Sequence, residues 1–94
     1  MTTPGFDPTV PADLEAWLVE RVAEYLPDLT ETIDPYRELG EYGLDSIAVV
    51  AFTADVEDRL GIALDPTAVW DYPTVAQLAK YIAGELDERR PQAA

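Results

Sequence analysis

Ser46 is the residue best placed to do chemistry in this chain. It follows Asp45 and precedes the most apolar run of the sequence, residues 47–54. Asp45 is a suitable helix N-cap, because its carboxylate can accept hydrogen bonds from the free amides of a first helical turn. Ser46 is therefore expected at the start of a helix with its hydroxyl exposed. An anion attached there would be stabilised by the helix dipole by about 0.3–1 kcal/mol.

The composition limits what Ser46 can do by itself. Nucleophilic catalysis by a serine needs a base within hydrogen-bond reach, and the chain has no histidine. Lys80, the only lysine, leaves a serine–lysine pair as an open alternative. No segment has the spacing of a calcium loop or of a glycine-rich phosphate loop, so we assign no catalytic and no metal-binding residue. Ser46 is then either a structural helix-start serine or a site that another enzyme modifies.

The chain is short and strongly acidic. Its 94 residues suffice for one small domain, and six basic against nineteen acidic residues give a formal net charge of −13. Nucleic acid and anionic membranes would repel this charge, whereas proteins with basic patches would be attracted, unless the acidity serves solubility alone. There is no cysteine, no membrane-spanning apolar run and no signal peptide pattern. We therefore expect a cytoplasmic protein.

Apolar spacing predicts an all-α fold. A first helix is expected over residues 11–26 and a second over residues 45–60. A short helix is expected to open at residues 65–66, and the last helix at Thr74, where Gln77 completes a capping box. No stretch alternates with the period of two that is typical of strands.

Residues 27–44 form a long connection between the first two helices, interrupted by prolines and glycines. Four apolar residues are expected to anchor it on the core: Leu29, Ile33, Tyr36 and Leu39. Residues 1–10 are expected to be a flexible N-terminal segment and residues 88–94 a flexible tail. Residues 11–87 are then the folded domain.

The second helix has two apolar faces. At about 100° per residue, one face consists of Val49, Phe52, Val56 and Leu60. Nearly opposite lies a second set, the apolar strip, formed by Ile47, Val50, Ala51 and Ala54. Either the helix is buried all round or the strip is exposed for a partner. We expect exposure, because so short a chain cannot easily surround a helix.

The residues around Ser46 resemble a known family. Gly43-Leu44-Asp45-Ser46-Ile47 resembles the Gly-x-Asp-Ser-[Leu/Ile] signature of acyl carrier proteins and of the carrier domains of polyketide and peptide synthases. The resemblance covers about residues 11–87 and extends to Glu38-Leu39-Gly40, Leu60-Gly61-Ile62 and Asp71-Tyr72-Pro73-Thr74-Val75. The pattern in residues 66–74 is more similar to polyketide-type carriers than to bacterial fatty acid carriers. It is also similar to carriers that adenylate-forming ligases load.

The resemblance implies a four-helix acyl-carrier bundle with three main helices, a short third helix and a long loop between helices 1 and 2. It also implies that Ser46 carries 4′-phosphopantetheine, attached from coenzyme A by a separate phosphopantetheinyl transferase. The thiol of this arm would hold acyl or polyketide intermediates as thioesters, and the protein would catalyse nothing itself. Two alternatives stay open: a carrier-like adaptor that binds partners without acylation, and a peptidyl carrier domain of a nonribosomal peptide synthetase.

The resemblance further implies a partner surface on the second helix. Its expected residues are Leu44, Asp45, Ile47, Val50, Ala51, Ala54, Glu57 and Asp58, the last two meeting basic patches. Besides the transferase, the expected partners are an acyl-loading ligase or acyltransferase and a ketosynthase or other synthase domain, and the carrier is expected to be a monomer. Many family members have glutamate at the position of Ala51, so this surface is expected to be more apolar than usual.

Overall fold

Helices alone form the fold. A computed structural model describes residues 7–65 and 67–89 of the chain. The helices follow in the order α1 (Pro11–Ala23), the 3₁₀ helix η1 (Leu39–Tyr42), α2 (Ser46–Leu60), α3 (Ala68–Asp71) and α4 (Val75–Arg89). No strand occurs within those two ranges. The expected all-α bundle, with a short third helix and a long loop before α2, is confirmed.

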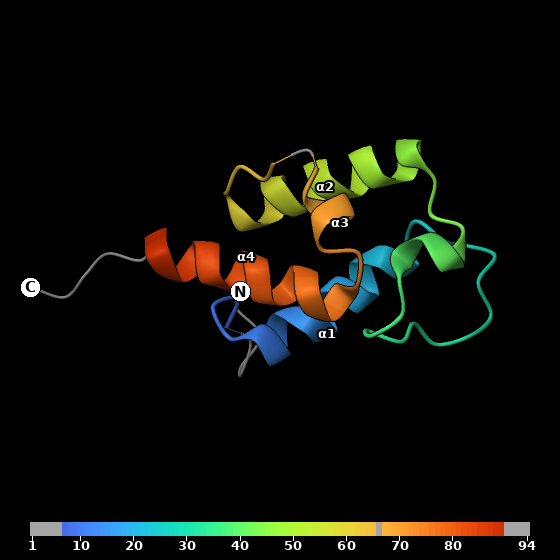
Figure 1. The fold of residues 1–94 in the computed structure, drawn as a ribbon, viewed down its shortest axis with the longest axis horizontal. Coiled ribbons are helices and arrows are strands. Elements are labelled where there is room, and N and C mark those ends of the chain that lie inside the picture. The colour runs from blue at the N-terminus through green and yellow to red at the C-terminus, as the bar shows by residue number, and fades with distance from the viewer. Residues whose placement is uncertain (1–6, 66, 90–94) are drawn as a thin grey trace, which may run out of the picture.

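The three long helices enclose one core. In the view of Figure 1, α4 runs between α1 and α2, and the short α3 lies between α2 and α4. α1 and α4 pack against each other along their lengths. The residues that fill the centre are almost wholly buried: Leu14, Leu18 and Val22 from α1, Phe52 and Val56 from α2, and Val75, Leu78 and Ile82 from α4. Tyr25 adds an edge-to-face contact to Phe52, with ring centroids 6.1 Å apart.

α1 ends three residues earlier than predicted. The amides of Tyr25 and Leu26 bond to the carbonyls of Val22 and Ala23, three residues back, at 2.9 and 3.1 Å. This tighter turn replaces a last α-helical turn before Pro27, because proline disfavours helical geometry in the residue that precedes it.

Backbone hydrogen bonds hold the long loop at the start of α4. The amide of Leu39 donates to the carbonyl of Pro73, and the amide of Ala76 donates to the carbonyl of Pro35, both at 2.8 Å. Ile33 and Leu39 are buried, as predicted. The prediction for Tyr36 was wrong, since its side chain is 75 % exposed. The bonds to α4 fix the backbone on both sides of Tyr36, so its ring is not needed as an anchor.

α3 also starts later than predicted. The Asp65 carboxylate accepts from the amide and the hydroxyl of Thr67, at 2.8 and 2.7 Å, and these bonds lower the pKa of Asp65. Asp65 thus caps a turn, and Thr67 is the residue before the helix. Pro66, predicted as its first residue, lies outside the described part of the chain.

The capping box of α4 is confirmed. The Gln77 amide donates to the Thr74 hydroxyl oxygen at 3.1 Å, and the Thr74 amide donates to the Gln77 side-chain oxygen at 3.3 Å. At the other end, α4 continues to Arg89, two residues beyond the boundary expected at residue 87. Residues 1–6 and 90–94, the remaining parts of the expected flexible ends, lie outside the described residues.

The start of α2 is built by three consecutive residues. Gly43 has a φ of 85°, a left-handed conformation that glycine adopts without strain. Leu44 then points into the core and is only 7 % exposed. Asp45 follows in an extended conformation, and its carboxylate accepts from the Ala48 amide at 2.8 Å. The predicted N-cap is confirmed, and Gly61 closes the helix with a φ of 69°.

Replacing Asp45 tests this cap. Asp45→Ala removes the acceptor for the Ala48 amide and should lower the free energy of unfolding by about 1 kcal/mol. Asp45→Asn keeps an acceptor of equal capping strength and should change it little. Urea unfolding followed by circular dichroism measures both. Equal losses in the two variants would mean that the charge, and not the hydrogen bond, stabilises the start of α2.

Two adjacent valines test the two faces of α2. Val49 is 4 % exposed and Val50 is 69 % exposed, so the same truncation meets opposite surroundings on one helix. Val49→Ala should lower the free energy of unfolding by about 2 kcal/mol through lost burial and a residual cavity. Val50→Ala should change it by less than about 0.5 kcal/mol. Denaturant midpoints of the two variants measure the contrast, and similar losses would show that both faces are buried.

Candidate functional site

Ser46 is the first residue of α2, and its side chain is exposed. It is also the only serine of the chain. Its hydroxyl borders an open, shallow depression lined by Ser46, Ile47, Val50 and Ala51. The amides of a first helical turn have no acceptors within their own helix, and only that of Ala48 is taken by Asp45. A phosphate ester on the Ser46 oxygen would therefore lie in a region that favours negative charge.

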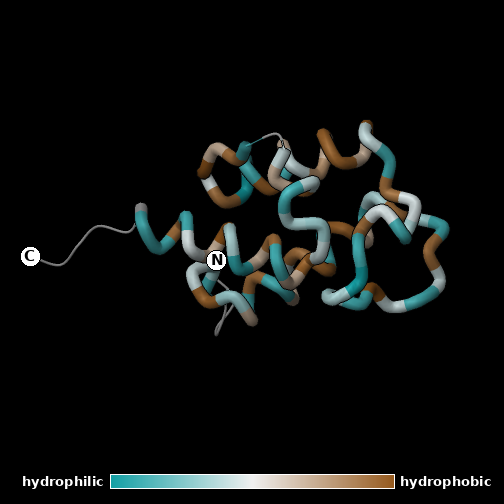
Figure 2. The backbone as a smooth tube through the Cα atoms, in the orientation of Figure 1, coloured by the Kyte–Doolittle hydropathy of each residue, from teal (hydrophilic) through white to brown (hydrophobic). Residues whose placement is uncertain are grey.

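The apolar strip is exposed, as expected. Ile47 is 81 % and Val50 69 % exposed, and Ala51 and Ala54 are exposed as well. The opposite face is buried at Val49, Phe52 and Val56 and half-buried at Leu60. The alternative of a helix buried all round is therefore wrong. In Figure 2 the hydrophobic colour recurs along α2, which fits a helix that is apolar on both of these faces.

Leu44 was predicted to belong to the partner surface, and the structure contradicts this. Its side chain is buried in the core and is not available to another protein. The left-handed turn at Gly43 rotates the chain so that Leu44 faces inward, while its neighbours Asp45 and Ser46 face outward. Leu44 therefore anchors the start of α2 on the core and is not part of the surface that a partner could contact.

The acidic residues of α2 differ in what they can offer a partner. Glu57 is half-buried, and its carboxylate accepts from the Leu64 amide at 2.7 Å, which holds the loop after α2. Asp55 accepts from the Arg59 side chain at 2.7 Å, a bond that raises the pKa of Arg59. Asp58 is exposed and has no hydrogen bond or ion pair to the rest of the described chain. Of the two acids predicted to meet basic patches, only Asp58 is unengaged.

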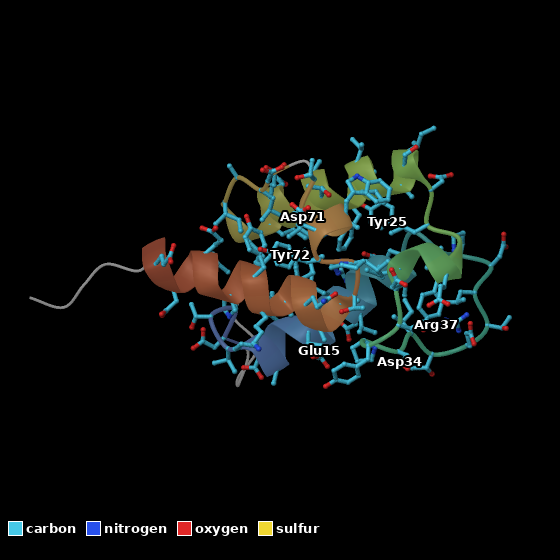
Figure 3. The ribbon with its side chains drawn as sticks, in the orientation of Figure 1. Glu15, Tyr25, Asp34, Arg37, Asp71 and Tyr72 are labelled. Atoms are coloured by element: carbon cyan, nitrogen blue, oxygen red, sulfur yellow. The ribbon has the colours of Figure 1, made fainter. Side chains whose placement is uncertain are left out.

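Tyr42 makes contacts within the long loop, and Tyr25 makes a hydrogen bond to α2. The Asp34 amide donates to the Tyr42 hydroxyl at 2.7 Å, and the Arg37 guanidinium lies 4.8 Å from the centre of the Tyr42 ring. Figure 3 shows Asp34 and Arg37 together on this loop. The Tyr25 hydroxyl donates to the Ala51 carbonyl at 3.3 Å. The pKa of Tyr25 is raised, mainly by burial and secondly by the negative charge of Asp55. These contacts hold residues 34–42 of the loop together and link Tyr25 to the middle of α2.

Helical periodicity did not predict the surroundings of two further residues, Trp70 and Thr53. Trp70 on α3 is 61 % exposed and borders a groove with Leu44, Val49 and Pro73. Thr53 on α2 is buried, and its hydroxyl has no hydrogen-bond partner within the described chain. Trp70 belongs to a helix too short for periodicity to show which face is exposed. Thr53 falls between the core face and the strip, and only the packed helices show that it is covered.

No basic side chain lines the depression at Ser46. Lys80 lies on α4 beside Tyr36 and Gln77, whereas the depression at Ser46 is lined by residues of α2 alone. Within residues 7–65 and 67–89, no group of three or more carboxylates is placed to hold a metal ion. Among the helices of this part of the chain, none is long and apolar enough to cross a membrane.

Comparison with known proteins identifies a family. The family model described as "Phosphopantetheine attachment site" matches residues 16–82. Mellein synthase of Phaeosphaeria nodorum is 31 % identical over an alignment of 86 residues, and the match covers 86 % of this chain and 5 % of that protein. Polyketide synthase ThaG of Burkholderia thailandensis is 35 % identical, and the match covers 97 % of this chain and 2 % of that protein, so the chain spans only a small part of these relatives.

Solved structures agree with the family model. A free-standing peptidyl carrier protein from Acinetobacter baumannii superposes with a TM-score of 0.76 and 40 % identity, covering 83 % of this chain and 98 % of that one. The HMG-ACPI domain from the CurA module of Lyngbya majuscula gives a TM-score of 0.81 and 27 % identity, covering 97 % and 92 %.

The site fits the group that this family carries. An exposed hydroxyl at the start of a helix, with free first-turn amides beside it, suits a phosphate ester, and the depression next to it leaves the approach open. The matched residues 16–82 include the whole of α2 and most of α4. The chain therefore belongs to the phosphopantetheine attachment family, and it is a carrier domain whose cofactor is 4′-phosphopantetheine.

Proposed function

We propose that Ser46 is the residue to which 4′-phosphopantetheine is attached. The observation that carries this proposal is the exposure of the chain's only serine at the first position of α2. Its oxygen would take the phosphopantetheine group of coenzyme A, losing its proton, while the adenosine bisphosphate half leaves. A phosphopantetheinyl transferase performs this step, because no base within the described chain lies in the depression at Ser46.

The residues of the chain present the arm and do not react with its cargo. Asp45 fixes the start of α2, the buried Leu44 holds this start on the core, and the Ser46 side chain is left exposed. The arm, when bound, supplies a thiol that holds acyl groups as thioesters. This explains how a chain without cysteine can serve as an acyl carrier. We accordingly propose that the protein is a substrate of its partners and contributes no catalytic group.

The cargo that we propose is an acyl or polyketide intermediate. Sequence relatives that match most of this chain include a polyketide synthase, ThaG of Burkholderia thailandensis. The partners that follow are an acyl-loading ligase or acyltransferase and a ketosynthase or other synthase domain. One observation favours a second candidate: the Acinetobacter baumannii structure, at 40 % identity, is a peptidyl carrier protein. An aminoacyl cargo for a nonribosomal peptide synthetase is therefore the alternative, and loading assays with acyl and aminoacyl donors separate the two.

Loading of Ser46 is the test of the attachment site. Apo protein incubated with coenzyme A, magnesium and a broad-specificity phosphopantetheinyl transferase should gain the mass of one phosphopantetheine. Ser46→Ala should gain none and should keep the circular dichroism spectrum of the wild type, because the side chain is exposed. Intact-protein mass spectrometry measures both.

Two results would contradict this function. A wild type that is never loaded, or a Ser46→Ala variant that is loaded normally, would exclude Ser46 as the attachment point. Binding of synthase partners that is unaffected by Ser46→Ala and by the arm would instead support the adaptor alternative. Labelling of the apo protein by a fluorophosphonate probe would indicate a serine hydrolase, which the surroundings of Ser46 do not favour.

A further inference from the structure

The long loop and the start of α4 form a second exposed surface, built without any residue of α2. Tyr36 from the loop lies beside Thr74, Ala76, Gln77 and Lys80 around one open, shallow depression. We call these five residues the Tyr36–Lys80 surface. In Figure 1, α2 runs along the upper edge of the molecule, and the first turns of α4 lie in the lower half. The depression at Ser46 shares no residue with this surface.

Lys80 has no carboxylate partner, although the chain has nineteen acidic residues. Within residues 7–65 and 67–89, no carboxylate oxygen lies within 4.0 Å of its ammonium group. By contrast, Arg21, Arg37 and Arg59 each pair with an acidic side chain. No acidic residue lines the depression beside Lys80 either. This surface is therefore a locally positive spot on a protein whose net charge is −13.

Tyr36 is presented on a backbone that is held on both sides. Its own amide donates to the Asp34 carboxylate at 2.9 Å, and the amide of Ala76 donates to the carbonyl of Pro35 at 2.8 Å. On the other side, the amide of Leu39 is bonded to the segment before α4. The ring nevertheless remains 75 % exposed. A tyrosine ring on a fixed backbone loses little conformational freedom on binding, so it is well suited to contact another protein.

The two exposed side chains define the chemistry of a partner. An exposed aromatic ring packs against an apolar side chain, and an ammonium group pairs with a carboxylate. Thr74 and Gln77 are bonded to each other in the capping box, so Lys80 supplies the charged contact. A segment that fits both contacts carries an acidic side chain close to an apolar one. Its charge is opposite to that of the basic partners that the net charge of −13 attracts.

We propose that the Tyr36–Lys80 surface binds a protein segment in which a carboxylate lies next to an apolar side chain. The carboxylate pairs with Lys80, and the apolar side chain packs on the Tyr36 ring. The net charge repels such a segment from a distance, so the two contacts act together and only at short range. Because the surface contains no residue of α2, a partner can be held here while Ser46 stays accessible.

A titration followed by nuclear magnetic resonance tests the proposal with a short peptide. Acetyl-Trp-Gly-Glu-amide should shift the backbone amide signals of Ala76, Gln77 and Lys80 in the isotope-labelled protein. The Kd should lie in the millimolar range, as expected for one packed ring and one exposed ion pair. Acetyl-Trp-Gly-Gln-amide, which lacks the carboxylate, should bind about threefold more weakly.

Variants of the protein assign the two contacts. Lys80→Gln should bind both peptides equally, because the carboxylate then has no charged partner. Tyr36→Ser should raise the Kd of both peptides about tenfold, through the lost packing on the ring. Ile47→Ser removes a similarly exposed apolar side chain from α2 and should leave both Kd values unchanged. Circular dichroism of the three variants should match that of the wild type, since all three side chains are exposed.

Three results would overturn the proposal. The first is a peptide that shifts no amide of the Tyr36–Lys80 surface, or that shifts the apolar strip instead. The second is a carboxylate effect of the same size in the wild type and in Lys80→Gln, because Lys80 would then not bind the carboxylate. The third is slower loading of Ser46 in the presence of the peptide, because the two surfaces would then not be separate. None of these results would remove Ser46 as the attachment point, and loading of Ser46→Ala would leave the peptide contacts intact.

Discussion

The turn from Gly43 to Asp45 determines where the functional residue lies. Leu44 must be buried, while Asp45 must stay where its carboxylate reaches the Ala48 amide at 2.8 Å. Both requirements are met because Gly43 adopts a left-handed conformation that other residues rarely adopt. Ser46 comes next, and its side chain is exposed. The core face and the apolar strip of α2 then follow from helical geometry, since the first residue fixes the rotation of all those after it.

Much of this arrangement could be predicted from the sequence because the signals are local. The capping pair Thr74 and Gln77, the N-cap Asp45 and the apolar spacing of α2 act within one or two helical turns. These signals located the helices and the exposed strip. They also predict Ser46 at the start of a helix, where the structure has it.

The wrong predictions for Tyr36 and Leu44, and the hydrogen bond of Glu57, depend on contacts that no helical periodicity shows. Tyr36 is exposed because backbone bonds from Leu39 and Pro35 to the start of α4 already hold the loop. Leu44 is buried because of the turn before it, although the sequence motif alone groups it with its exposed neighbours. Glu57 serves the loop after α2 through a bond to Leu64, seven residues on. No local rule shows which of two neighbouring acids, Glu57 or Asp58, is engaged in this way.

The protein combines a long-range charge with a short-range apolar surface. The net charge of −13 acts over several ångströms and repels nucleic acid and anionic membranes. The strip can act only on contact, and it lies beside Ser46, the residue proposed here as the attachment point. One small bundle thus presents both a charge that acts at a distance and an apolar surface that can act only on contact.

The most direct measurement of the central claim is the position of the arm on the loaded protein. Trypsin cleaves after Arg37 and Arg59, so one peptide, residues 38–59, contains Ser46 together with two other hydroxyl residues, Tyr42 and Thr53. Fragmentation of this peptide should place the phosphopantetheine on Ser46, the exposed hydroxyl at the start of α2, and leave the buried Thr53 unmodified. An arm found on Tyr42, on Thr53 or on any other peptide would contradict the account.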